Sequence, residues 1–341
     1  MKKHLIATAV AAAVAVPAMA QNVTISGRID TSLATTNKNS VGNSQTFMLS
    51  DVLTSNELVI GGSEDLGGGL KANFRVATPF ASDSNAGSST TFNFGGRGMT
   101  VGLSGGFGSV NLGRSAGTTG NSVMASSFVG NIGNLGTITA RPDNSIDYTT
   151  PIFSNFSIRA LYSTGAEKTD KTEGVQSEVT ATYSAGPLLA RLYRGSLGAA
   201  TGSNDSKETG AQVNYDFGMA AVNFRYIDLD VENGRNSDVQ KYGVGVRAPI
   251  GNGLALVADY SKYDLKGTND ANDSKVMAVG IIKDLSKRTN VYAVYAKADN
   301  NGAATRGAFG SSTTATVQDP QRATAAGEDP HAFAIGIRHS F

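Results

Sequence analysis

The sequence predicts an all-β fold: a transmembrane antiparallel β-barrel of about sixteen strands. Three observations support this prediction. Apolar and polar residues alternate along short segments through almost the whole chain, which is typical of strands with one apolar face. Short and long connections alternate between these segments, as in barrels with tight turns at one membrane face. No run of eighteen apolar residues occurs after residue 20, which excludes a helical membrane protein but not a barrel.

The polar face of the predicted strands is rich in arginine. In the first strand, Val23, Ile25 and Ile29 alternate with Arg28 and Asp30. Five predicted strands each place an arginine on this face: Arg28, Arg75, Arg159, Arg225 and Arg247. A soluble sandwich would carry mixed lysine, glutamate and threonine on a solvated face. The repeated arginines therefore indicate a shared, water-filled interior.

The segments can be counted along the chain. We expect strands to begin near Asn22, Ser50, Gly69, Thr91, Phe107, Ser145, Asn155, Val175, Leu188, Glu208, Met219, Val239, Gly253, Lys275, Thr289 and Ala332. An even number of antiparallel strands closes without a free edge and leaves both chain ends at the short-turn end. No break in composition suggests a second domain, so residues 21–341 are predicted to form a single barrel domain.

Residues 1–20 have the features of a cleaved secretory signal peptide. A basic start at Lys2 and Lys3 is followed by an apolar stretch and by the small-residue site Ala18-Met19-Ala20. Without Lys2 and Lys3 the 29 basic residues become 27, against 28 acidic ones, so the net charge is about −1. Such a balance gives no indication of a nucleic-acid partner.

Groups for catalysis and metal binding are scarce. The chain has no cysteine, which excludes disulfides and thiolate sites, and only His331 and His339 follow residue 20. Asp228, Asp230 and the acids of 270–274 could bind calcium, but no EF-hand loop follows, and solvated acids are the simpler interpretation. We expect no cofactor, no metal and no catalytic residue.

Five motifs occur in a fixed order along the chain. They are GGSEDLGGGLKANFRV at 61–76, TVGLSGGFGSVNLGR at 100–114, RPDNSIDYTTP at 141–151, DLSKRTNVYAVYA at 284–296 and GIRHSF at 336–341. Together they resemble the general porins of Gram-negative outer membranes, in the group common in betaproteobacteria. The resemblance implies a homotrimeric barrel in the outer membrane, surrounded by lipid and lipopolysaccharide, through which small ions and solutes diffuse passively. It also implies that the terminal Phe341 is a signal for the outer-membrane assembly machinery.

The third external loop, about residues 115–144, is expected to fold inward and narrow the pore. This role is implied by the resemblance, and the loop contains Phe128, Ile132, Leu135 and Ile138, which suit a packed interior better than open water. Residues 115–142 contain no aspartate or glutamate. Many porins place carboxylates on this loop opposite arginines, so the usual charge separation across the constriction is in doubt here.

We therefore expect an arginine-rich constriction that favours small anions. The candidate residues on strands are Arg28, Lys71, Arg75, Arg159, Arg191, Arg225 and Arg247; beside the loop they are Arg114, Arg141 and Asp143. The alternative is that Asp30, Asp147, Asp228 and Asp259 neutralise the arginines locally and leave weak selectivity. Two other functions compete with a channel: a barrel enzyme that uses His331 or His339 as its base, and a secreted adhesin or sandwich.

Overall fold

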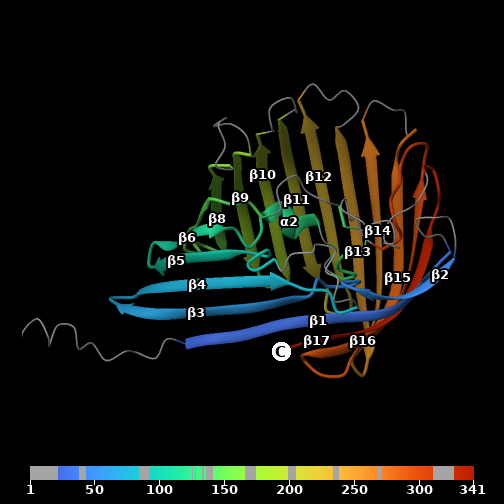
Figure 1. Ribbon diagram of the computed structural model, residues 1–341, viewed down its shortest axis with the longest axis horizontal. Helices are drawn as coiled ribbons and strands as arrows, with labels where there is room; N and C mark the ends of the chain where they lie inside the picture. Colours follow the sequence, from blue (N-terminus) through green and yellow to red (C-terminus); the bar gives the residue numbers. More distant parts are fainter. Residues whose placement is uncertain are drawn as a thin grey trace, which may run out of the picture.

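The computed structural model describes residues 22–37, 44–83, 93–124, 126, 128–132, 134–135, 141–165, 174–198, 205–232, 238–266, 271–309 and 326–341. They form one sheet of seventeen strand segments and one short helix, α2 (Thr119–Met124) (Figure 1). The strands are β1 (Asn22–Thr36), β2 (Gln45–Ser50), β3 (Glu57–Gly67), β4 (Leu70–Pro79), β5 (Met99–Gly105), β6 (Gly108–Arg114), β7 (Ser145–Thr149), β8 (Phe156–Ser163), β9 (Gln176–Ala185), β10 (Leu188–Leu197), β11 (Ser206–Asp216), β12 (Ala221–Val231), β13 (Val239–Gly251), β14 (Leu254–Leu265), β15 (Ser274–Asp284), β16 (Thr289–Asn300) and β17 (His331–Ser340). The predicted signal peptide, residues 1–20, lies outside the described residues.

The sheet closes on itself as a barrel. Apart from β2 and β3, which both pair with β1, each strand pairs antiparallel with its neighbours along the chain, and β17 returns to pair with β1 from Arg28 opposite Ser340 to Thr36 opposite Ala332. Closure satisfies the backbone hydrogen bonds of the first and last strands, which a membrane requires because lipid offers no partners. No helix among the described residues is long and apolar enough to span a membrane.

The second strand of the barrel is broken into two segments. β2 pairs with the Thr31–Thr36 half of β1, and β3 pairs with the Asn22–Arg28 half. The two segments therefore share one position in the wall, and seventeen segments fill sixteen positions. The prediction of about sixteen strands is confirmed, but the break was not predicted. Residues 51–56, here called the β2–β3 insert, leave the sheet at Asp51, whose φ is +66°.

Other predicted starts agree with the structure, with one further exception. All predicted starts but the second and the fourth lie within two residues of the first residue of an observed strand. The fourth strand was predicted to begin near Thr91, whereas β5 begins at Met99. Residues 93–98 form a turn, and Ala77 of β4 exchanges backbone hydrogen bonds with Arg97 and Gly98. Thr91 itself lies outside the described residues.

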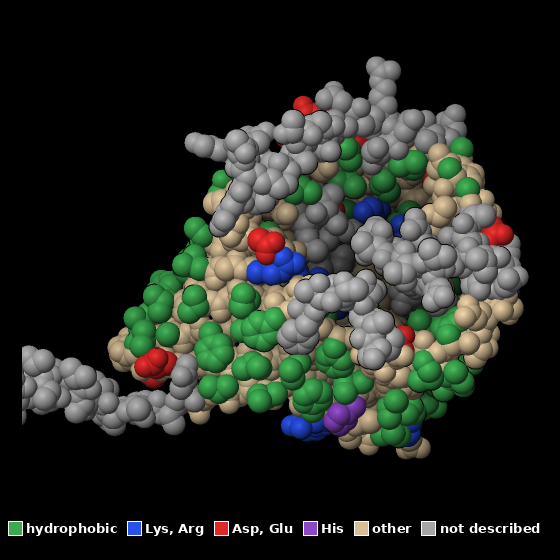
Figure 2. Space-filling model, viewed as in Figure 1, with side chains coloured by type: hydrophobic (Ala, Val, Ile, Leu, Met, Phe, Trp, Pro, Cys, Tyr) green, Lys and Arg blue, Asp and Glu red, His purple; other side chains and the backbone are tan. Residues whose placement is uncertain are grey.

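The strands separate an apolar outer face from a polar lumen face. In β1, Ile25 and Leu33 are more than half exposed, whereas the alternate residues Asp30 and Ser32 are buried. Large apolar side chains spread over the outer surface of the wall (Figure 2). In a membrane these positions contact lipid, so their exposure is the expected arrangement rather than a defect.

Apolar residues also pack inside the barrel, where they fix the segments that narrow it. The inward loop, residues 115–144, contributes Val123, Val129, Ile132 and Leu135, which are almost completely buried. They pack with residues of the β2–β3 insert, Val52 and Leu53, and with Ala308 and Phe309 after β16. Phe128 packs partly against this cluster, and Ile138 lies outside the described residues. The predicted inward position of the loop follows from this burial of apolar surface.

Candidate functional site

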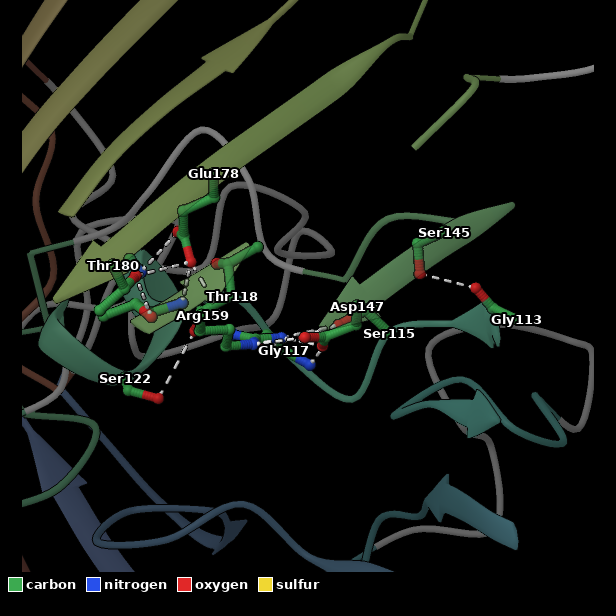
Figure 3. Close-up of polar contacts among 12 residues, drawn as sticks. Gly113, Ser115, Gly117, Thr118, Ser122, Ser145, Asp147, Arg159, Glu178 and Thr180 are labelled. Carbon is green, nitrogen blue, oxygen red and sulfur yellow. Dashed lines mark hydrogen bonds and ion pairs between the residues drawn. The ribbon is translucent and has the colours of Figure 1, made fainter. Parts of the chain in front are cut away.

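The inward loop is attached to the barrel wall by a polar latch at its beginning (Figure 3). The backbone N–H groups of Thr119 and Gly120 donate to the two carboxylate oxygens of Glu178 on β9, at 2.6 and 3.1 Å. α2 contains no acidic residue in its first turn, so Glu178 supplies the negative charge that a helix N-terminus favours. Glu178 is almost fully buried, which makes these hydrogen bonds costly to break.

Arg159 completes the latch from β8. Its guanidinium pairs with Asp147 and donates to the carbonyl oxygen of Gly117 at 2.8 Å. It also lies 3.8 Å from Glu178. Arg159 therefore binds two carboxylates and the loop backbone, and its charge is compensated locally. The expected role of Arg159 in attracting solutes is reduced by this pairing.

The β2–β3 insert approaches the loop from the opposite wall and is held by Asp30. The N–H groups of Leu53 and Thr54 donate to Asp30 Oδ2 at 2.8 and 2.7 Å, and Tyr292 donates to Oδ1 at 2.6 Å. Asn56 accepts from the N–H of Asp30 at 2.6 Å. Asp30 is fully buried and binds the insert through these hydrogen bonds, and the charge of Arg338 also acts on it.

The insert and the inward loop touch each other. Asn131 donates through Nδ2 to the carbonyl oxygen of Asp51 at 2.6 Å, and Gly130 lies against Leu53. Two segments far apart in sequence thus meet inside the barrel and fix part of the lumen outline. Lys and Arg side chains are visible in the hollow that the wall surrounds (Figure 2).

Four arginines gather beside the insert and form what we call the arginine cluster: Arg28, Arg75, Arg97 and Arg141. Two carboxylates lie among them. Glu57 is 2.9 Å from Arg28 and 3.9 Å from Arg75, and Asp51 is 3.9 Å from Arg97. Among the described residues the cluster thus has more cations than anions. Its Arg97 and Arg141 Nε atoms are buried without a described hydrogen-bond partner.

Burial and neighbouring charges shift the pKa values of three groups of this region that lie in loops or turns: Arg97, Arg141 and Asp51. Burial, together with nearby Arg97, lowers the pKa of Arg141 to about 10, and burial also lowers that of Arg97. Burial raises the pKa of Asp51 to about 6, despite the N–H of Asn56 and the charge of Arg97. Arg97 and Arg141 remain charged at neutral pH, whereas the pKa of Asp51 is close enough to 7 for its charge to change near neutral pH.

Arg114 and Asp143 stand at the two ends of the loop and bind each other. Arg114 Nη1 donates to Asp143 Oδ1, and both side chains are partly or largely exposed. Arg114 is in register with Met99, whose side chain lies on the outer face. Its charge still acts on Arg141. The pair joins the two ends of the loop, and a place for Arg114 in the constriction itself remains a prediction.

The other predicted residues are spread over the barrel rather than brought together. Arg247 pairs with Asp284 at 3.0 Å near the short-turn end, and Lys71 is exposed near the β3–β4 turn. Arg191 donates to Gln212 at 2.9 Å. These positions lie on the lumen-facing rows of their strands, but they do not belong to the arginine cluster.

Arg225 requires a correction, because it does not face the open lumen. It is fully buried, and its Nη2 donates to both oxygens of Asp259 at 2.8 and 2.7 Å. Asp259 also contacts Ser126 of the inward loop, so the pair lies behind the loop. The sequence pattern identified the facing of Arg225 but could not show that the loop covers it.

The alternative of local neutralisation holds for some arginines only. Asp147 and Asp259 pair with Arg159 and Arg225, as that alternative requires. Asp228 instead binds Lys266, as does Asp230, which removes the two acids of the suggested calcium site. No group of His, Cys, Asp or Glu in the described part of the chain could hold a metal ion. Asp270 lies outside that part.

Sequence reasoning missed Arg97, Glu57 and Asp51. Arg97 occupies a turn that was predicted to be part of a strand. The alternation of apolar and polar residues does not predict which way the side chain of a turn residue points. The glycines on both sides of it, in GGRG, were the available signal for such a turn. Asp51 was missed because the break in the second strand was not foreseen.

Comparison with known proteins supports one family. A family model described as Gram-negative porin matches residues 7–303. The chain is 32% identical to outer membrane porin protein 32 of Delftia acidovorans and 26% identical to an outer membrane porin protein of Bordetella pertussis, with all of each chain covered. A solved anion-selective porin from Comamonas acidovorans is 28% identical, with a TM-score of 0.81 over 94% of this chain and 100% of that one. The trimer form of OmpT from Vibrio cholerae, 20% identical, matches with a TM-score of 0.67 over 94% of this chain and 100% of that one, and shows the fold alone.

Proposed function

The chain belongs to the Gram-negative porin family and is an outer-membrane channel protein, and we propose that its channel passes small anions in preference to cations. Members of this family are non-enzymatic channels, so the two competing functions, a barrel enzyme and a secreted adhesin, are ruled out. Small hydrophilic solutes and ions diffuse through such a channel without a cofactor.

The arginine cluster is the observation that carries the anion preference. Its four guanidiniums lie beside the insert with only Glu57 and Asp51 among them in the described residues. The inward loop adds no carboxylate between residues 115 and 142. An excess of fixed positive charge raises the local concentration of anions within about a Debye length, ~8–10 Å at physiological salt. The anion-selective porin of Comamonas acidovorans, with the same fold, adds support.

Reversal potentials test this proposal. The purified protein is inserted into a planar bilayer under a tenfold gradient of potassium chloride, and the sign of the reversal potential gives the preferred ion. Replacement of Arg97 by Gln should reduce the chloride preference, because Arg97 lies in the cluster, where four arginines share the two carboxylates Asp51 and Glu57. Arg247→Gln is the matched control, since Arg247 pairs with Asp284 near the short-turn end. A wild-type channel that prefers potassium would refute the proposal.

We further propose that the protein is a homotrimer, and a polar seam on the outer face supports it. Ser82 and Asp83 lie over the break between β2 and β3: Ser82 N–H donates to Ser50 Oγ at 2.7 Å, and Ser50 donates to Asp83 at 2.6 Å. Ser50 is in register with Thr31, which in turn pairs with the outward-facing Ile337. A carboxylate at this level is costly in lipid, whereas a second copy of the chain can cover it. Light scattering in detergent should give three chains per particle, and a monomer would contradict the proposal.

The remaining proposals concern export and surroundings. Residues 1–20 are proposed to be removed as a signal peptide, which leaves residues 21–341 as the single barrel domain. The outer face is proposed to contact lipid and lipopolysaccharide, and Phe341 to be recognised by the assembly machinery. Mass spectrometry of the protein from outer membranes tests the first: an N-terminus at Gln21 is expected, and an intact Met1 would contradict it.

A further inference from the structure

The segment after β16, residues 301–309, turns back into the barrel and is firmly held there. Asn300 bonds to the backbone of Arg306 twice: its Nδ2 donates to the carbonyl oxygen at 2.9 Å, and its Oδ1 accepts from the N–H at 3.0 Å. Ala308 and Phe309 are buried in the same apolar cluster as Ile132 and Leu135 of the inward loop. The backbone position of Arg306 is therefore fixed from both sides.

The side chain of Arg306 stacks on an aromatic ring beside the inward loop. Its Cζ lies 3.2 Å from the ring centroid of Tyr263, which is on the lumen-facing row of β14. The hydroxyl of Tyr263 donates to the carbonyl oxygen of Asn134 in the loop at 2.5 Å. A guanidinium stacked face-on keeps its N–H donors at its edge, where they can bind a planar anion through two parallel hydrogen bonds.

Among the described residues, no acid compensates the charge of Arg306. In the part of the chain that the structure describes, no carboxylate forms an ion pair with it, and the ring it stacks on, that of Tyr263, is uncharged at neutral pH. The charge of Arg306 acts on Lys241, a second cation of the lumen wall. Arg306 is partly exposed, unlike Arg225, which also lies near Tyr263 but is fully buried against Asp259.

We propose that Arg306 is a specificity-determining residue of the channel: a fixed cation beside the inward loop that contacts carboxylate- or phosphate-bearing solutes as they pass. This inference rests on the proposed anion preference and adds a second positive position to it. Arg306 follows β16 and stacks on Tyr263 of β14, whereas the four arginines of the cluster lie beside the β2–β3 insert. Solutes therefore meet the two positions separately, and their effects on selectivity should be separable.

The test compares Arg306→Gln, Arg306→Lys and the control Arg194→Gln. Arg194 lies on the outward-facing row of β10, like the exposed Leu192, and its Nη1 donates a hydrogen bond to Thr209 Oγ1. Its replacement removes the same charge outside the lumen. Under a potassium chloride gradient, Arg306→Gln should lower the chloride-to-potassium permeability ratio about twofold, the effect of one charge screened over ~8 Å of water. Arg306→Lys and Arg194→Gln should leave the ratio unchanged.

A second readout concerns the ligand class. With potassium acetate or phosphate in place of chloride, Arg306→Lys should lose part of the wild-type permeability for the organic or phosphate anion, because an ammonium lacks the planar fork. Acetate and phosphate thus distinguish carboxylate from phosphate recognition. Loss for neither would overturn the proposed contact.

The outcomes separate this inference from the proposed function. An anion-preferring wild type with an unchanged Arg306→Gln ratio would overturn the role of Arg306 alone, whereas a cation-preferring wild type would defeat the proposed function itself. Equal loss in the Gln and Lys variants would show that the segment has merely moved, and would also overturn the inference. If Arg306→Gln does not form channels, Arg306→Met gives the same test, because the apolar methionine side chain can still pack on the ring of Tyr263.

Discussion

Gly130 of the inward loop lies directly against the carbonyl oxygen of Leu53 in the β2–β3 insert. A Cβ added to Gly130 would be 1.4 Å from that oxygen, and the φ of Gly130 is +60°. Only glycine combines this conformation with so close an approach. The contact sets how near the loop can come to the insert, and therefore fixes the part of the lumen outline that the two segments form together.

Replacement of Gly130 by Ala should force the loop and the insert apart. We expect a loss of about 2 kcal/mol or more in the free energy of unfolding, from the collision and the strained φ together. The single-channel conductance should change as well. Both are measured on the refolded protein, the first by urea unfolding in detergent micelles and the second in a bilayer.

Gly186→Ala is the matched control for this prediction. Gly186 has a similar φ of +53° in the β9–β10 turn, but nothing lies within 4 Å of an added Cβ. It should show the strain without the collision and leave the conductance unchanged. Equal behaviour of the two variants would mean that the contact between Gly130 and Leu53 does not determine the lumen.

Removal of one partner from the buried pair of Arg225 and Asp259 should destabilise the barrel strongly. Both side chains are inaccessible to solvent, so Arg225→Met leaves a buried, unpaired carboxylate. We expect a loss of about 3–5 kcal/mol in the free energy of unfolding. Arg247→Met, at the partly exposed pair with Asp284, should cost less than about 1 kcal/mol. Urea unfolding in detergent micelles measures both, and similar losses in the two variants would contradict the argument.

The barrel could be predicted because its determinants are local. Alternation of side chains along one strand decides which residues face lipid and which face the lumen, so Ile25, Arg28 and Asp30 could be assigned from their neighbours alone. The inward position of the loop was implied by the family resemblance, and the apolar character of Ile132 and Leu135 agreed with it. Neither assignment required knowledge of a residue distant in sequence.

The details of the site could not be predicted because they depend on distant partners. The β2–β3 insert leaves the sheet because Asp30 binds the N–H groups of Leu53 and Thr54, a contact that no local pattern of residues 51–56 reveals. The burial of Arg225 depends in the same way on a loop about a hundred residues earlier. Arg306 lies in a long connection, where alternation gives no facing at all.

Acidification should strengthen the anion preference. The pKa of Asp51 is raised to about 6, so this carboxylate is charged at pH 7.5 and largely neutral at pH 5. Its protonation removes one negative charge beside Arg97, and the chloride-to-potassium permeability ratio should therefore rise as the pH falls, with a midpoint near 6. Because its folded pKa exceeds the ordinary value, Asp51 stabilises the fold at low pH and loses that contribution as the pH rises through about 6.

Asp51→Asn is the control for this pH dependence. The amide is neutral at every pH, and its oxygen can still accept from the N–H of Asn56. The variant should show the higher, acid-like ratio already at pH 7.5 and lose the transition near pH 6. Reversal potentials between pH 5 and 8 provide the measurement. A transition that persists in Asp51→Asn would assign it to another group.

Deletion of Phe341 should impair assembly in cells more than it alters the channel. The backbone of Phe341 exchanges two hydrogen bonds with Gly27, at 3.0 and 3.1 Å, and its ring covers the Cα of Gly27 on the outer face. The residue thus closes the seam between β17 and β1, and its ring lies on the outer face whereas Arg28 lies on the lumen-facing row, so the conductance of refolded protein should be nearly unchanged. A sorting signal, in contrast, acts before the barrel has closed. Quantities of folded protein in outer membranes, compared with the conductance after refolding in vitro, distinguish the two roles: equal losses in both measurements would leave Phe341 a purely structural residue.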